Sequence, residues 1–193
     1  MRFSIPRFCS VFVFGSVLAV CFSLPAHALQ VDGVELPDTF AYEGQTLTAN
    51  GSGTRLYSFL KIKVYSATLY LPVKNSNPEQ ILASKLPRVL HLKMRVDAKR
   101  DDAMEAWAYY LKQNCSSPCK INPQSQARFL DAQANLKEGD TETYFFTAQG
   151  LMIKRNGQDV LNIGDADFAN LVLAGWLGKE PTTEALKAKL LGN

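Results

Sequence analysis

The chain has 193 residues, of which 47% are apolar and 20% are charged. This composition is typical of a globular protein and excludes the disordered, collagen-like and multi-span membrane classes. The formal net charge is only +3 at pH 7, so no strong basic field favours a nucleic acid or an anionic membrane surface as the partner.

Residues 1–28 have the pattern of a secretory signal peptide. Two arginines precede an apolar run from Phe8 to Leu24, and the small-residue triplet Ala26-His27-Ala28 closes the segment. A positively charged start, an apolar centre and a small-residue cleavage site direct a chain to export. We therefore predict one periplasmic, or otherwise exported, domain over residues 29–193, with no membrane span in the mature chain.

The chain from Val31 to Leu71 is predicted to form strands. An Asp32-Gly33 dipeptide between two valines signals a tight turn, and Asn50-Gly51-Ser52-Gly53 interrupts a strand that starts near Gln45. From Phe59 onward, β-branched and aromatic residues are frequent, and apolar side chains alternate with lysines. This stretch predicts a long central strand.

Two helices and a further strand follow. Asn77-Pro78 favours a short helix through Leu82. From Arg88 to Val96 apolar and polar residues alternate, so His91 is predicted to point away from the core as a surface residue. Asp97 is expected to cap a helix that runs to Asn114. The core-facing stripe of this helix comprises Met104, Trp107, Ala108 and Leu111.

Cys115 and Cys119 lie in the segment that follows this helix. In an exported protein such thiols are expected to pair, so we predict a local disulfide whose ring is too small to hold the fold together. The spacing differs from the Cys-x-x-Cys of redox enzymes. These two cysteines and His91 are too few for a four-ligand structural metal site, and no metal or other cofactor is predicted.

The rest of the chain is predicted to contain a helix, three strands and two helices. Pro123 begins a helix that Gly139 ends, and Asn156-Gly157 is the preferred dipeptide of a tight hairpin within a meander over residues 141–163. Asp165 or Asp167 caps a helix that Gly178 stops, and Pro181-Thr182 leads into a closing helix. This order predicts an α+β fold in which helices lie on one face of an antiparallel sheet.

General catalytic signatures such as GxSxG, HExxH or a phosphate loop are absent from the sequence. The order of several segments, however, resembles the chalcone isomerase-like family, which comprises plant chalcone–flavanone isomerases, fatty-acid-binding relatives and secreted bacterial members. These segments are Gly51-Ser52-Gly53-Thr54-Arg55, the strand from Phe59 to Leu71, Leu136 to Asp140, Asn156-Gly157, and Asp167 to Gly178 with Pro181. The resemblance implies an open-faced β-sandwich, with a large antiparallel sheet under a layer of helices.

The resemblance also implies candidate site residues. The essential arginine of the isomerases, which ends a G-x-G-x-R stretch, falls on Arg55, and Tyr65 resembles a tyrosine of the fatty-acid-binding branch. The helix asparagine of the enzymes falls near Trp107, whereas their catalytic tyrosine has no counterpart near the start of this helix. An arginine offers a charged planar fork and a tyrosine offers a neutral donor, so the pair can hold an anion. Without the resemblance, Arg55 would be interpreted as a solvated charge at a strand end.

Arg55 and Tyr65 would stand roughly 33 Å apart on one unbroken strand, so the chain is expected to turn between them. A turn centred on Ser58-Phe59 sets Arg55 opposite Ile62. It leaves Arg55 and Tyr65 offset by three residues, or roughly 10 Å, which two long side chains can bridge. The central dipeptide lacks the glycine or asparagine that tight hairpins prefer.

We therefore expect a monomeric exported protein that binds a small amphipathic acid, resembling a fatty acid, or another apolar ligand through Arg55, Tyr65 and Trp107. No nucleic acid is expected as a partner. Two alternatives are an intramolecular lyase or isomerase of the chalcone isomerase type, in which Arg55 stabilises an oxyanion, and a non-catalytic structural or partner-binding envelope protein. A cleft filled by Trp107 and Trp176 would favour the latter.

Overall fold

The computed structural model describes residues 28–116 and 118–193. The predicted signal peptide lies outside these residues, except for Ala28. The described chain begins with a small hairpin of strands β1 (Ala28–Val31) and β2 (Val34–Pro37). Asp32 and Gly33 join the two strands with positive φ angles of 48° and 84°, which confirms the predicted tight turn.

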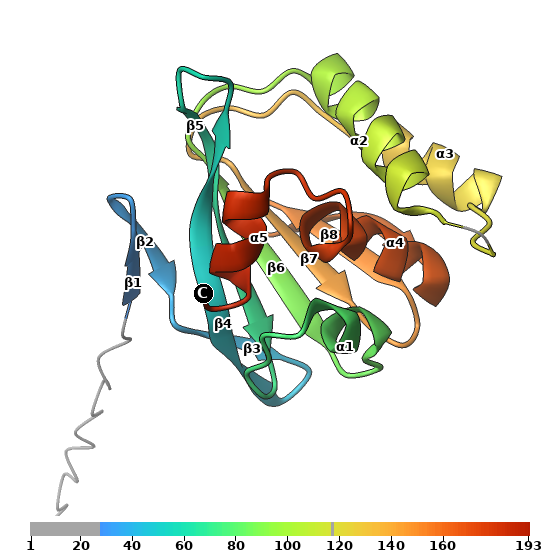
Figure 1. Ribbon diagram of the computed structural model, residues 1–193, viewed down its shortest axis with the longest axis horizontal. Coiled ribbons are helices and arrows are strands. Elements are labelled where there is room, and N and C mark those ends of the chain that lie inside the picture. The colour runs from blue at the N-terminus through green and yellow to red at the C-terminus, as the bar shows by residue number, and fades with distance from the viewer. Residues whose placement is uncertain (1–27, 117) are drawn as a thin grey trace, which may run out of the picture.

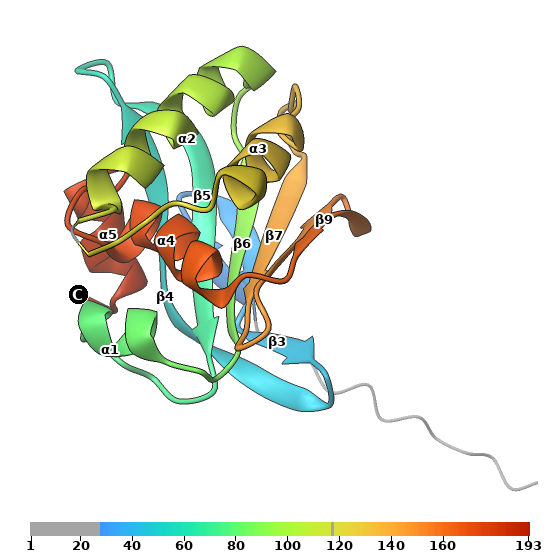
Figure 2. The same cartoon turned by 90° about the vertical axis from the view of Figure 1, so that its right-hand side faces the viewer.

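Within the described residues, a seven-stranded sheet forms the centre of the molecule, and each strand pairs antiparallel with the next strand along the chain. The strands are β3 (Thr39–Tyr42), β4 (Gln45–Tyr57), β5 (Ile62–Leu71), β6 (Arg88–Met94), β7 (Thr141–Phe146), β8 (Leu151–Arg155) and β9 (Gln158–Ile163). The helices lie over one face of this sheet (Figure 1, Figure 2). They are α1 (Pro78–Ala83), α2 (Arg100–Asn114), α3 (Pro123–Asp131), α4 (Ala166–Leu177) and α5 (Glu184–Leu190).

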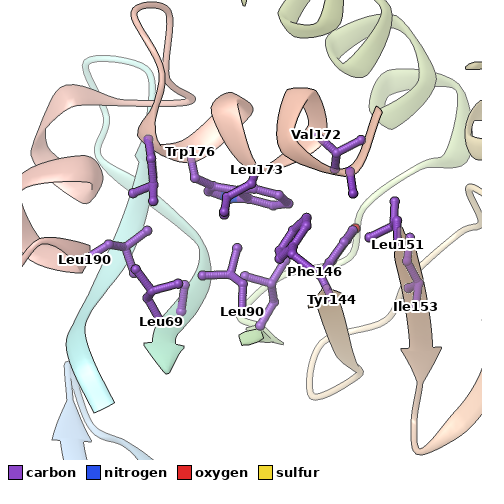
Figure 3. Close-up of a cluster of buried hydrophobic side chains, with 14 of the residues drawn as sticks. Leu69, Leu90, Tyr144, Phe146, Leu151, Ile153, Val172, Leu173, Trp176 and Leu190 are labelled. Atoms are coloured by element: carbon purple, nitrogen blue, oxygen red, sulfur yellow. The ribbon is translucent and has the colours of Figure 1, made fainter. Parts of the chain in front are cut away.

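The main core lies between this sheet and the helices. Leu173 and Trp176 of α4 face sheet residues such as Leu69 and Leu90 (Figure 3). A smaller cluster of buried side chains lies on the opposite face of the sheet and comprises Leu47, Ala49, Tyr70, Val89 and Phe145. The arrangement confirms the predicted α+β fold, an antiparallel sheet under a layer of helices.

The Gly51-Ser52-Gly53 stretch does not interrupt a strand, contrary to the prediction. β4 continues through it with one register shift between Ala49 and Gly51. A β-carbon added at Gly51 would overlap the carbonyl oxygen of Lys189 in α5, and one at Gly53 would lie 2.7 Å from the β-carbon of the same lysine. The two glycines therefore allow α5 to approach the backbone of the sheet closely.

Some predicted helix caps are confirmed and one is wrong. Asn77 and Asp165 accept hydrogen bonds from the first-turn amides of α1 and α4, as N-cap residues do. Asp97 does not cap α2, which begins at Arg100. Its carboxylate instead accepts a hydrogen bond of 2.7 Å from Lys137 Nζ, so a contact distant in sequence takes the place of the predicted cap.

The helix predicted from Pro123 to Gly139 is shorter in the structure. α3 ends at Asp131, and Leu136 then pairs with Ala98 through backbone hydrogen bonds of 2.9 Å in both directions. A backbone pairing between distant segments thus replaces the last part of the predicted helix.

His91 points away from the main core but is not a surface residue as predicted. Its ring centroid lies 6.5 Å from that of Phe40 in β3, and its Nδ1 lies 2.9 Å from Thr143 Oγ1. The side chain is half-buried, because the second face of the sheet also carries apolar residues.

Cys115 and Cys119 form a disulfide with their Cα atoms 5.2 Å apart, which confirms the predicted pairing. Cys115 is the C-cap residue of α2, so the bridge joins the end of this helix to the loop before α3. Such a bond is compatible with an exported protein.

Neither a membrane span nor a metal centre is found in the part of the chain that the structure describes. No helix there is both long enough and apolar enough to cross a bilayer. The same residues contain no group of three His, Cys, Asp or Glu side chains that could hold a metal ion.

Candidate functional site

Strands β4 and β5 form the hairpin that carries both residues of the predicted anion site. The turn spans residues 58–61, rather than centring on Ser58-Phe59, and a register shift follows it. Val64 is the extra residue of β5 at this shift, so Arg55 pairs directly with Tyr65. The predicted offset of three residues is therefore wrong, and the two residues are direct cross-strand neighbours.

This pairing brings Arg55 and Tyr65 together on the helix-facing side of the sheet. The guanidinium carbon of Arg55 lies 5.8 Å from the centroid of the Tyr65 ring, which is a cation–π contact. Tyr65 is only 6% exposed, and Arg55 is half-buried. Arg55 is therefore not the fully solvated strand-end charge that its sequence context alone suggests.

The Tyr65 hydroxyl is anchored inside the protein by α4. Trp176 Nε1 donates a hydrogen bond of 2.8 Å to the Tyr65 hydroxyl oxygen. Burial raises the pKa of Tyr65, and the positive charge of Arg55 opposes that rise. The hydroxyl consequently keeps its proton at neutral pH and remains a neutral hydrogen-bond donor.

Two buried polar atoms near Tyr65 have no hydrogen-bond partner among the described residues. They are Nε of Arg55 and Oγ1 of Thr182. The Thr182 hydroxyl has no partner in good hydrogen-bond geometry, but it lies close enough to the Tyr65 hydroxyl for a weak hydrogen bond that lowers the pKa of Tyr65. Nor does Arg55 form an ion pair with any carboxylate of the described residues. Because a buried polar atom without a partner costs about 1–3 kcal/mol, the protein itself leaves the Arg55 guanidinium incompletely satisfied.

Arg88 is a fully buried arginine whose Nε, like that of Arg55, has no hydrogen-bond partner among the described residues. It differs from Arg55 in that the other end of its guanidinium is hydrogen-bonded. Its Nη1 donates hydrogen bonds of 3.0 to 3.1 Å to the carbonyls of Ile81 and Leu82 and to Asn170 Oδ1. Burial lowers the pKa of Arg88 to about 10. Arg88 therefore links α1 and α4 to the sheet through acceptors of the protein itself.

Sequence reasoning missed Thr182, which it places only at the start of the closing helix. The residue lies in the loop between α4 and α5, where its amide donates a hydrogen bond of 2.7 Å to the Gly175 carbonyl. No local motif marks this position, because the packing of the loop against β5 alone brings Thr182 to Tyr65.

Trp107, the third predicted site residue, packs against Trp176, the hydrogen-bond partner of Tyr65, and is buried in the core. Its ring centroid is 4.9 Å from that of Trp176 and 5.0 Å from that of Phe129, both in edge-on packing. A β-carbon at Gly175 would lie 2.7 Å from the Trp107 ring, so the glycine makes room for the indole. The space between α2, α4 and the sheet is thus filled at this point, and a contact between Trp107 and a ligand stays a prediction.

A buried carboxylate lies farther along the sheet and was not predicted. Glu142 accepts hydrogen bonds from Arg155 Nε at 3.0 Å and Nη2 at 2.7 Å, and the Tyr144 hydroxyl donates to it at 2.8 Å. Burial and the nearby Glu142 raise the pKa of Tyr144 well above its ordinary value. Because each polar group here has a partner, this cluster has the character of a structural ion pair.

An apolar surface leads from Arg55 toward the end of the hairpin. Val64 packs against the main core, since the register shift brings it to the same side of β5 as Tyr65, and Ile62 lies on that side two residues before it. Tyr57 is the cross-strand partner of Ile62. Both are exposed, so a chain of apolar side chains extends outward from the guanidinium.

Two surface cavities lie elsewhere, beside the N-termini of α3 and α4. They measure about 390 and about 540 Å³, and both are lined by Asn122 and Asp165. Asn122 caps α3, and Asp165 accepts a hydrogen bond of 2.7 Å from Ser125 Oγ. The two polar side chains that both cavities share are therefore engaged in helix capping, and neither cavity includes Arg55 or Tyr65.

Comparison with known proteins agrees with the resemblance found in the sequence. The family model described as chalcone isomerase-like matches residues 28–192. Among solved structures, the fatty-acid binding protein AtFAP1 of Arabidopsis thaliana is similar, with a TM-score of 0.65 and 14% sequence identity over 82% of this chain and 92% of that chain. At this identity the likeness shows the fold alone. No curated protein sequence matches the chain.

Proposed function

Because the chain belongs to the chalcone isomerase-like family, we propose that it binds a small amphipathic anion of the fatty-acid type, with Arg55 and Tyr65 at the polar end of the site. The observation that carries this proposal is the Arg55 guanidinium, whose buried Nε lacks a partner and which pairs with no carboxylate of the described residues. The similarity in fold to a fatty-acid binding protein supports the choice of ligand class.

The polar groups match the head of such a ligand. A carboxylate has two acceptor oxygens, and the guanidinium can donate to both of them in a charge-assisted geometry. The neutral Tyr65 hydroxyl and the neighbouring Thr182 hydroxyl add further hydrogen-bonding groups beside it. An acidic ligand would thus satisfy atoms that the protein leaves without partners.

The ligand tail then follows the exposed apolar surface rather than the interior. Trp107 and Trp176 fill the space between the helices and the sheet, so an acyl chain has no room there without displacing them. Val64, Ile62 and Tyr57 instead offer apolar contact from Arg55 outward along the hairpin. We place the tail along these three residues.

The site of action in this proposal is the periplasm or another exported location. The signal-like segment over residues 1–28 and the disulfide between Cys115 and Cys119 support it. In the same proposal, residues 29–193 act as a monomeric domain after cleavage.

The first prediction concerns the charge at the centre of this site. Arg55→Gln is expected to weaken the binding of a fluorescent fatty acid about 10- to 100-fold, because it removes a charge-assisted contact of about 1.5–3 kcal/mol. Titration of the purified protein with the fatty acid, without lipid vesicles, measures the dissociation constant. Mass spectrometry of lipids that co-purify with the protein identifies the natural ligand class.

Arg128→Gln is the matched control, because Arg128 lies on α3 and, among the described residues, its side chain donates only to the Asn162 carbonyl. This variant should bind the fatty acid as the unaltered protein does. The proposal is wrong if Arg55→Gln and Arg128→Gln bind equally well, or if the unaltered protein neither carries an acidic lipid nor binds the added one.

A partner-binding protein without a small ligand is the second candidate. The filled space between Trp107 and Trp176 favours it, because a tightly packed interior leaves the surface as the place of recognition. Absence of fatty-acid binding in the titration would favour this candidate.

A further inference from the structure

The end of the β4–β5 hairpin exposes large apolar side chains to an unusual extent. Phe59 is 91% exposed, Leu60 66% and Tyr57 60%. The end of the hairpin projects from the sheet (Figure 1), and the exposed fractions show that these side chains are left largely uncovered. A contiguous group of exposed apolar residues marks an interaction site. We call residues 57–62 the hairpin tip.

The turn holds its two central residues at the outermost point of the hairpin tip. Lys61 N donates to the Ser58 carbonyl at 3.1 Å and Leu60 N to Ser58 Oγ at 3.3 Å. Ser58 and Lys61 have positive φ angles of 62° and 51°, a conformation that costs free energy in a residue other than glycine. Phe59 and Leu60 are therefore presented outward by a closed turn.

The charged residues within the end of the hairpin are all basic. Between Arg55 and Tyr65 the chain carries Lys61 and Lys63 and contains no aspartate or glutamate. The acidic group near Lys63 is Asp32, at 4.0 Å, and both side chains are about half exposed. An apolar end with basic residues behind it matches an anionic lipid surface, where acyl chains lie beneath charged headgroups.

We propose that the hairpin tip docks the protein on an anionic membrane surface, with Phe59 and Leu60 in the interfacial layer and Lys61 and Lys63 against the headgroups. A protein partner fits the same surface less well. Standard protein interfaces bury about 800 Å² on each side and use 20 to 30 residues, whereas the hairpin tip is a narrow convex end of two strands. A fluid bilayer can close around such an end without a complementary shape.

Docking in this way places the candidate ligand site next to the membrane. Arg55 and Tyr65 pair just inside the hairpin tip, and Ile62 and Tyr57 connect the two regions. An amphipathic acid could then pass between the bilayer and the guanidinium without crossing open water. The docking itself does not depend on ligand binding, so the two proposals can fail separately.

The second prediction tests the hairpin tip with vesicles. The purified protein is expected to sediment with vesicles of equal parts phosphatidylcholine and phosphatidylglycerol, and to bind weakly to vesicles of phosphatidylcholine alone. The double variant Phe59→Ser with Leu60→Ser should lower the partition coefficient at least about tenfold, because two apolar side chains no longer enter the lipid. Lys61→Gln should reduce the preference for phosphatidylglycerol.

Val73→Ser with Leu86→Ser is the matched control, since these residues are 74% and 56% exposed and lie outside the hairpin tip. The control should bind vesicles normally, and both double variants should keep the thermal midpoint of the unaltered protein. The proposal is overturned if the protein binds neither vesicle, or if the tip and control variants bind alike. If vesicle binding is absent and the tip variant abolishes self-association in analytical ultracentrifugation, the hairpin tip is a contact between copies of the protein, and the proposal is also overturned.

Discussion

His91 is a residue whose ionisation the fold opposes. Its imidazole lies close to Thr143 and to the ring of Phe40 on the second face of the sheet. Burial lowers the pKa of His91 from its ordinary value of 6.5, and the neighbouring Lys93 acts in the same direction. The native state thus favours the neutral imidazole.

The third prediction follows from this pKa. As the pH falls below about 6.5, the unfolded state binds a proton at His91 that the native state resists, so the free energy of unfolding should fall from there down to the lowered pKa of the native state and level off below it. Urea denaturation between about pH 7.5 and about pH 5.5 measures this fall. His91→Gln should flatten the dependence in that range. An unchanged slope in the variant would show that another group is responsible.

At the residue scale, the sequence identifies the candidate pair but not its geometry. Arg55 and Tyr65 are recognisable from a family pattern, whereas their direct pairing depends on the extra residue Val64 in β5. Such a register shift has no local signature here. Thr182 was not predicted, because only the packing of a distant loop places it beside Tyr65.

Among the secondary-structure elements, α5 and β4 form the closest contact between a helix and the sheet. The backbone of α5 at Lys189 and Leu190 lies directly over Gly51. Asn50 strengthens the contact, since its side-chain amide donates to the Leu190 carbonyl at 2.8 Å. The glycines of this stretch therefore serve packing, although the resemblance associates the stretch with a ligand-binding arginine.

The fourth prediction tests this packing. Gly51→Ala should lower the free energy of unfolding by about 3 kcal/mol, because the added methyl group meets the backbone of α5 and not a flexible side chain. Chemical denaturation measures the change. Gly164→Ala is the control and should change stability by less than about 0.5 kcal/mol, since the nearest atom to its added β-carbon is 4.0 Å away. Equal stability of the two variants would contradict the packing role of Gly51.

Elements with local signals were predicted well, and those set by distant contacts were not. Asn156-Gly157 forms the hairpin turn between β8 and β9 with φ angles of 49° and 79°, as its residues dictate. Asp97 has the chemistry of an N-cap, but Lys137 binds its carboxylate instead. The helix predicted to continue to Gly139 ends early for the same reason, because Leu136 pairs with a distant segment.

On the scale of the whole molecule, the disulfide contributes little compared with the sheet. The bridge between Cys115 and Cys119 closes a short ring at the surface. The main core, by contrast, contains side chains from each of the strands β5 to β9 and from all five described helices. The loss of so small a ring frees little chain entropy in the unfolded state.

The fifth prediction is that the protein remains folded without this bond. Cys115→Ser with Cys119→Ser should lower the free energy of unfolding by about 2 kcal/mol and leave the far-ultraviolet circular dichroism spectrum unchanged. Thermal and chemical unfolding measure the difference. Loss of folded structure in the double variant would show that the bridge holds more than the end of α2.

The overall charge of the molecule hides an uneven distribution. A formal charge of +3 argues against a membrane surface when the chain is treated as a whole, yet residues 55–65 hold basic residues without an acidic one. The same segment contains Phe59 and Leu60, which a strand prediction places in the sheet. The sequence predicts a turn centred on Ser58-Phe59, but not its extension to Lys61, because this turn uses positive φ angles at Ser58 and Lys61, which neither residue favours.

The packing of α5 on β4 also has a consequence for folding. Because the order of strands in the sheet follows the chain, each strand can pair with its predecessor through a contact that is local in sequence. Helix α5, however, covers β4, although most of the sheet lies between the two in the chain. The glycine surface of β4 therefore stays uncovered until α5 docks on it, and a polypeptide that lacks α5 would leave this surface open to solvent.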